Sequence, residues 1–352
     1  MSYNSLFGLG THAGDTALEG HWLLQDNAAS TVVVDSSSNG NDATASANTS
    51  TLSTTGPGGH LPSAFAFDGL STRVDHTFTD TNTDQTIGAW IKTAVNGDRS
   101  AVSVADSSST KQQKRLQAAA SDGHFEAMSF DGTPKLVRIS DSRKDDGNWH
   151  FSVALFENGG GRGGYTDGYF RPITGPSDSI SNLDRFTIGV SADSTPWGFW
   201  DGDIAGAFRF DRLLTETECG EVEAGPEPLN LTAPAVSGTH ETGQTLTTSN
   251  GTWDNQANGT IAYTYQWQRA DDASGTNAAD ISGATSSTYT LTASDENKYV
   301  RATIVASNDG GSDPSEDQAT AWTLVTSGGG GPTFQPAWAI NATMIATRTV
   351  VQ

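Results

Sequence analysis

The segment that decides the fold spans residues 85–92 and reads Gln-Thr-Ile-Gly-Ala-Trp-Ile-Lys. It is short, apolar around Trp90 and bounded by polar residues, which is the pattern of a β-strand. Similar segments recur at residues 64–69, 73–75, 125–130, 135–139, 149–156, 185–190 and 203–210. Strands at this spacing, with no helical pattern between them, predict an antiparallel sandwich rather than alternating β and α units.

The length of 352 residues predicts two domains with tails. We assign residues 1–14 to an N-terminal arm, 15–224 to the first domain, 225–232 to a linker containing Gly-Pro-Glu-Pro, 233–326 to the second domain, and 327–352 to a Gly-rich spacer and an apolar, β-type tail. Residues 43–60, rich in Ala, Ser, Thr and Gly, predict a surface loop. The Thr-x-x-Glu pattern at Thr215 predicts a short helical turn.

The second domain shows its own strand pattern, at residues 245–248, 262–269, 287–292 and 299–307. Trp267 lies in the middle of one of these strands, where Tyr263 and Tyr265 alternate with polar residues. This arrangement predicts a second, smaller β-sandwich with Trp267 in its core.

The composition excludes some partners. The chain carries 19 Lys and Arg against 41 Asp and Glu, a formal charge of −22, so phosphate backbones and anionic membrane surfaces would be repelled. The single cysteine, Cys219, excludes an intrachain disulfide. The first residues show neither the basic start nor the apolar run of a signal peptide, and no segment reaches the roughly 18 to 20 apolar residues of a membrane helix.

Residues from Leu18 to Leu214 resemble the laminin-G-like family of jelly rolls, also called concanavalin A-like lectins, and its pentraxin relatives. The resemblance implies an all-β fold, with a concanavalin A-like jelly-roll sandwich as the first domain. The segments that carry it occur in the family's order, and they are Gly20 to Asp26, Val34 to Thr44, Ala64 to Gly69, Thr86 to Lys92, Asn148 to Phe151 and Phe199 to Ile204.

Residues 233–324 resemble the immunoglobulin-like repeats of bacterial and phage proteins. The motifs that carry this resemblance are Gly-Thr-Trp253, Tyr265-Gln-Trp267-Gln-Arg269, Tyr289-Thr-Leu291 and Tyr299-Val-Arg301-Ala-Thr-Ile304. Modules of this kind usually space, stack or decorate, and the resemblance implies a non-catalytic second domain.

A calcium ion is the sharpest site hypothesis. The turn from Asp35 to Asp42 offers oxygen ligands from Asp35, Asn39, Asn41 and Asp42, and hard cations prefer such ligands. The family resemblance implies that the closing strand, with Asp203, lies nearby. The alternative is that these Asp and Asn side chains form Asx turns by accepting hydrogen bonds from local N–H groups.

Exposed aromatic residues beside polar loops are the expected platform for a sugar, and Tyr165, Trp197 and Trp200 lie in Gly- and Asp-rich segments. The alternative for Trp200 is that it leads the last strand into the core. Hydrolytic relatives of this jelly roll carry Glu-x-Asp-x-Glu on one strand, and the sequence has no such triplet. We therefore predict that the chain is not an enzyme.

The C-terminal tail is predicted to be an assembly element, because its apolar residues need a partner surface. These residues are Phe334, Trp338, Ile340, Met344 and Ile345. Together these features predict a structural or decoration protein of a bacteriophage virion that displays a lectin-like domain to host glycans. We expect it to form a homo-oligomer and to bind capsid or tail proteins. The alternative is a bacterial cell-surface adhesin.

Overall fold

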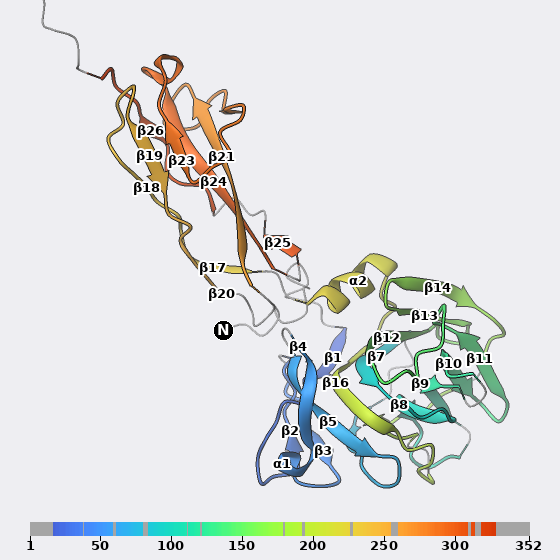
Figure 1. Cartoon of the computed structure of the whole chain (residues 1–352). Coiled ribbons are helices and arrows are strands. Elements are labelled where there is room, and N and C mark those ends of the chain that lie inside the picture. The colour runs from blue at the N-terminus through green and yellow to red at the C-terminus, as the bar shows by residue number, and fades with distance from the viewer. Residues whose placement is uncertain are drawn as a thin grey trace, which may run out of the picture. The chain divides into compact units, whose positions relative to one another are not determined.

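The computed structural model describes residues 17–37, 39–58, 61–79, 84–110, 112–119, 122–178, 180–191, 194–225, 228–254, 260–308, 311–313 and 318–328. The fold is almost entirely β-strand, which confirms the predicted all-β class. The chain forms two compact units, the first reaching Leu229 and the second built mainly from the chain after it (Figure 1). No helix among the described residues is long and apolar enough to cross a membrane. The predicted arm at 1–14 and the predicted tail residues from Phe334 onward lie outside the described residues.

The first unit contains two antiparallel sheets of eight described strands each. One sheet runs in the order β14(Tyr169–Thr174), β13(Arg162–Thr166), β12(Trp149–Phe156), β7(Gln85–Lys92), β16(Asp201–Phe210), β5(Leu61–Asp68) and β4(Ser53–Gly58), and β1(Leu18–Trp22) pairs with β16. The other runs in the order β11(Pro134–Arg138), β10(Phe125–Phe130), β9(Gln113–Ala118), β8(Arg99–Ala105), β15(Arg185–Ile188), β6(Val74–Thr77), β3(Ala43–Ala45) and β2(Val32–Val33).

The core between the sheets follows from alternation along the strands. On β7 the side chains of Ile87, Ala89 and Ile91 are fully buried in one cluster, which also contains Leu116 of β9 and Phe125 of β10. Alternate strand residues point to one face, so these positions define the inner faces of the two sheets. The segment at 85–92 lies near the middle of its sheet, as its apolar character predicts.

A helix covers the outer face of the first sheet. Helix α2(Glu216–Ala224) begins at Thr215, whose side chain accepts a hydrogen bond from the Glu218 N–H while Glu218 bonds back to the Thr215 N–H. Its buried Cys219 and Val222 pack in a cluster with Phe208 of β16. The capping pattern predicted a single turn here, and the structure extends it to nine residues because this apolar face is buried.

The predicted surface loop at 43–60 is wrong over most of its length. It contains β3, the short helix α1(Thr49–Leu52) and β4. Ala43, Ala45 and Leu52 are buried in the main core. The low-complexity composition was misleading because alanines at alternate positions of a strand can pack in a core between larger side chains.

The chain from Leu229 onward also forms antiparallel strands and contains the core of the second unit. Its elements are β17(Leu229–Thr232), β18(Val236–Ser237), β19(Thr245–Thr248), β20(Thr252–Asp254), β21(Ala262–Ala270), β22(Ala279–Asp280), β23(Thr288–Thr290), the 3-10 turn at Ala293–Asp295, β24(Tyr299–Asn308), β25(Gly311–Asp313) and β26(Thr323–Leu324). Trp267 is fully buried in its core together with Leu246, Val300 and Ile304, as predicted for a sandwich centred on this tryptophan.

Candidate functional site

A groove lies over the strands β9, β10 and β11 of the first unit. Its volume is about 540 Å³, and its lining includes Asp98, Arg115, Met128, Phe130, Pro134 and Trp197. The strand register explains how these residues meet. Arg115 lies opposite Met128, which lies opposite Leu136, and in the next row Gln113 lies opposite Phe130, which lies opposite Pro134.

Alternation separates the groove from the core. On β9, Leu116 and Ala118 point into the core between the sheets, so Gln113 and Arg115 point to the other face. On β10, Phe125 and Ala127 belong to the core, whereas Met128 and Phe130 line the groove. The floor of the groove is therefore the outer face of this sheet.

Trp197 stands at the groove with its ring fixed in place. Its side chain is 37% exposed, and the guanidinium carbon of Arg115 lies 4.2 Å from the ring centroid. The Arg115 side chain is only 2% exposed, and its Nη2 lies 3.3 Å from Oδ1 of Asp98. A cation stacked on an aromatic ring stabilises the pair, so Arg115 and Asp98 support Trp197 in a defined orientation.

Backbone contacts hold the two walls of the groove. Ser191 and Trp197 exchange backbone hydrogen bonds of 3.1 and 3.2 Å, which close the loop that carries Trp197. The next residue, Gly198, has a φ of +63°, which a residue without a Cβ adopts at little cost. The Ser194 N–H donates to the Ser109 carbonyl at 3.1 Å, so the segments that contribute Thr195 and Thr110 to the groove are joined.

Glu126 lies one row further along the same face of β10, two residues before Met128. Gln117 of β9 donates a hydrogen bond of 3.0 Å to its carboxylate. Burial is the main reason why the pKa of Glu126 is raised, and the hydrogen bond from Gln117 opposes the rise. A carboxyl group of this kind accepts a proton more readily than an exposed one.

Of the three aromatic residues predicted to bind carbohydrate, the structure places only Trp197 at the groove. Trp200 is fully buried in the core between the sheets. The prediction that it stacks on a sugar is therefore wrong, and the alternative that it leads the last strand into the core is confirmed. Tyr165 is only 5% exposed, packs in the cluster under α2 and donates a hydrogen bond to Glu223. Its prediction is corrected too, because alternation on β13 turns its ring toward the helix.

The polar side chains of the predicted calcium turn bond within the protein. The Asp35 carboxylate accepts hydrogen bonds from the N–H groups of His21, Ser37 and Asn41, and from the Ser37 hydroxyl. The amide groups of Asn39 and Asn41 donate to the backbone carbonyls of Leu18 and Glu19 respectively. The Asp42 carboxylate accepts from the Asp35 N–H at 2.9 Å. Asp35 therefore forms the Asx turn of the alternative, by accepting from the Ser37 N–H, whereas Asn39 and Asn41 donate to the first strand.

Asp203 is not brought to that turn by any contact among the described residues. It lies on β16 opposite Lys92, whose Nζ is 3.1 Å from its carboxylate. Three or more acidic, His or Cys side chains grouped as metal ligands do not occur in the described parts of the chain. Calcium binding at the turn stays a prediction, with Asp203 set apart from the other four residues.

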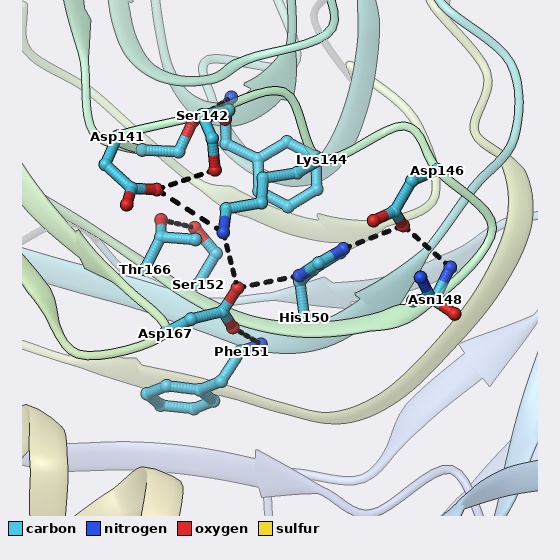
Figure 2. Close-up of polar contacts among 12 residues, drawn as sticks. Asp141, Ser142, Lys144, Asp146, Asn148, His150, Phe151, Ser152, Thr166 and Asp167 are labelled. Carbon is cyan, nitrogen blue, oxygen red and sulfur yellow. Dashed lines mark hydrogen bonds and ion pairs between the residues drawn. The ribbon is translucent and has the colours of Figure 1, made fainter.

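A second polar cluster surrounds His150 at the start of β12 (Figure 2). Its Nδ1 lies 2.7 Å from the Asp167 carboxylate and its Nε2 lies 3.0 Å from Asp146. Lys144 lies 3.0 Å from Asp167 and 3.4 Å from Asp141. Burial opposes a charge on His150, but the bonds to both carboxylates outweigh it, so the pKa of His150 is raised. These charges compensate one another and fasten the segment 141–148 to the sheet.

Sequence reasoning missed most residues of the groove. Arg115, Met128, Phe130 and Asp98 were not singled out, and β8 and β9 were not predicted as strands. A signal does exist in the alternation of Gln113, Arg115 and Gln117 with Lys114, Leu116 and Ala118, since the two series belong to opposite faces.

The two stacked antiparallel sheets of the first unit form a β-sandwich, and this fold also has a counterpart among known families. Residues 66–219 match the family model Laminin_G_3, described as the Concanavalin A-like lectin/glucanases superfamily. This match and the two stacked sheets support the concanavalin A-like jelly roll that the resemblance implied for the first domain. No match was found among curated proteins.

Solved structures with a similar fold share little sequence with this chain. Domain 4 of AbnA, an extracellular arabinanase from Geobacillus stearothermophilus in complex with arabinotriose, is 16% identical with a TM-score of 0.46, covering 58% of this chain and 97% of that one. A SAP-like pentraxin from Limulus polyphemus is 15% identical with a TM-score of 0.37, covering 45% and 79%. The sialidase CBM40 of Ruminococcus gnavus bound to sialyllactose is 11% identical with a TM-score of 0.33, covering 39% and 80%.

Proposed function

We propose that the first unit binds an oligosaccharide in the groove over β9, β10 and β11, with Trp197 as the stacking platform. The observation that carries this proposal is that Trp197 is exposed and yet fixed. Its ring rests on the buried Arg115 guanidinium, and its backbone is bonded in both directions to Ser191. An aromatic side chain held in its bound orientation loses little conformational entropy when a ligand arrives.

The groove has the chemistry that a sugar requires. Its volume of about 540 Å³ falls within the roughly 300–1,000 Å³ of small-molecule sites. Met128, Phe130 and Pro134 supply apolar surface, while Asp98 and the walls at Thr110 and Thr195 supply polar groups. A sugar has apolar C–H faces and a rim of hydroxyl groups, so it can contact both kinds of surface at once.

We propose binding without hydrolysis. Hydrolysis of a glycosidic bond normally uses two carboxyl groups, roughly 5 to 9.5 Å apart, one of which donates a proton. On this face, Asp98 is paired with the supporting Arg115 and Glu126 accepts a hydrogen bond from Gln117. Incubating the full chain with an oligosaccharide that it binds, followed by chromatography of the products, tests this point. Cleavage that is lost in Glu126→Gln would show that the protein is an enzyme.

Replacing Trp197 tests the binding site. We expect Trp197→Ala to weaken oligosaccharide binding by the full chain at least about tenfold, or ~1.4 kcal/mol, measured by a glycan array followed by calorimetry. Tyr169→Ala is the matched control, because Tyr169 on β14 is a comparably exposed aromatic residue in the other sheet. Equal losses in both variants, or no loss in Trp197→Ala, would contradict the proposed site.

The setting that we propose for this activity is a bacteriophage virion. Support comes from the sequence, in which four glycines at 328–331 precede a tail with Trp338, Ile340 and Met344. Apolar residues in such a tail call for a partner surface, and the immunoglobulin-like second unit would act as a spacer. Mass spectrometry of purified virions tests the assignment, and deletion of 328–352 should prevent incorporation while both units fold. Detection on bacterial cell surfaces instead would favour the adhesin alternative.

A further inference from the structure

We propose that the groove selects neutral oligosaccharides and rejects those that carry a carboxylate, such as sialylated or uronic acid-containing glycans. This inference rests on the proposed glycan binding and names the class of ligand for the same groove. The inference depends on which charged side chains of the groove are exposed to a ligand and which are buried in contacts within the protein.

The cation of the groove is not available to an anion. The Arg115 side chain is 2% exposed, its guanidinium carbon lies against the ring of Trp197, and Nη2 faces Asp98. A ligand carboxylate could reach this guanidinium only by displacing Asp98 or by moving Trp197, which would remove the stacking platform. Arg115 therefore acts as a support and not as an anion-binding group.

The charge that the groove does present is negative. The Asp98 side chain is 49% exposed, so its carboxylate meets solvent at the groove while one oxygen faces Arg115. Glu126 lies in the adjacent row. Burial is the main cause of its raised pKa, and the charges of Asp122 and Asp98 add to the rise while Gln117 and Arg138 oppose it. Like charges raise one another's pKa, so these carboxylates lie within each other's electrostatic reach.

Arg138, the cation opposite Glu126 on β11, is already paired, because it forms an ion pair with Asp122. The chain as a whole carries a charge of −22, which adds repulsion toward an approaching anion. A neutral sugar meets no such penalty, and its hydroxyl groups can donate hydrogen bonds to the exposed oxygen of Asp98.

Matched pairs of glycans test the selection. The full chain is titrated with neutral oligosaccharides and with the sialylated forms of the same oligosaccharides, by calorimetry at low salt and at 0.5 M salt. We expect the neutral member of a pair to bind at least about tenfold more tightly, and the difference to shrink at high salt because of screening. Asp98→Asn should narrow the difference in affinity between the neutral and the sialylated oligosaccharide. Asp141→Asn removes the same charge outside the groove and should leave this difference unchanged.

The outcomes separate this inference from the function on which it rests. Equal or tighter binding of the sialylated member, lost in Trp197→Ala, would overturn the selection for neutral sugars and leave the glycan site standing. An unchanged difference in Asp98→Asn would overturn the role of Asp98. If neither member of any pair binds, the proposed function fails and this inference fails with it.

Discussion

Two polar loops of the first unit, both predicted to hold a ligand, use their side chains in opposite ways. In the turn from Asp35 to Asp42, carboxylate and amide groups bond to the protein's own backbone. In the loop that carries Trp197, the backbone bonds close the loop and the large side chain stays exposed. The comparison indicates that a polar loop can present a side chain to a ligand when backbone hydrogen bonds hold the loop. When the side chains themselves hold the loop, they are not free to contact a ligand.

The largest expected effect comes from Trp200, three residues after Trp197. Trp200 is fully buried in the core, so we expect Trp200→Ala to lower the free energy of unfolding by about 3–5 kcal/mol. Denaturant unfolding of the full chain measures the change. Trp197→Ala should cost far less stability although it removes the same side chain. Similar losses for the two variants would break the distinction between core and platform.

The second largest loss of stability is expected from the turn between Asp35 and Asp42. Asp35→Ala leaves three backbone N–H groups without their acceptor, and we expect a loss of about 1–3 kcal/mol. Asp26→Ala is the control, since Asp26 accepts from the Val34 N–H at the longer distance of 3.4 Å. Thermal unfolding compares them. A stable Asp35→Ala protein would mean that the turn does not depend on these bonds.

The cluster around His150 resembles the turn from Asp35 to Asp42, because its charged groups also pair within the protein. The folded pKa of His150 is raised, so its stabilising contribution is complete below the unfolded pKa of about 6.5 and is lost as pH rises through the folded value. We expect His150→Gln to cost about 1 kcal/mol at pH 6 and less at pH 9. Unfolding curves at both pH values test this, and a pH-independent loss would contradict it.

The carboxylates of the same cluster titrate in the opposite direction. Burial opposes the charge on Asp146, but its hydrogen bonds from His150 and Asn148 prevail and lower its pKa to about 2. Its contribution is therefore complete above the unfolded value of about 3.9 and is lost as pH falls toward 2. Two-dimensional NMR titration of the Asp146 carboxyl measures this midpoint, and a value near 4 would show that the bonds are not formed.

Calcium should give the smallest effect. Coordination at the turn would require Asp35 to exchange hydrogen bonds for metal contacts, so we expect weak binding, with a dissociation constant of about 10⁻⁴ to 10⁻³ M. Calorimetric titration of the full chain and of Asp42→Asn tests the prediction. Absence of heat would remove the site, and tight binding would mean that the turn rearranges around the ion.

The sequence was a good guide to the strands and a poor guide to the groove. Apolar segments such as 149–156 and 203–210 were predicted close to their observed bounds because burial imposes their pattern. The strands β8 and β9 were missed because Ser, Lys, Gln and Arg interrupt their apolar residues. Trp197 was predicted as a candidate from its polar surroundings. Arg115 was not, since only the fold shows that an arginine 82 positions earlier lies beneath it.

The floor and the walls of the groove differ in how strongly the fold restrains them. Strand residues of the floor such as Met128 alternate with residues of the packed core, so we expect substitutions there to disturb the fold. The walls at Thr110 and Thr195 lie in loops, which accept insertions at low cost. The two loops are joined by the hydrogen bond from the Ser194 N–H to the Ser109 carbonyl, so we expect a change in one loop to affect the other. We therefore expect paired changes at these two loops to alter the groove without rebuilding the sandwich.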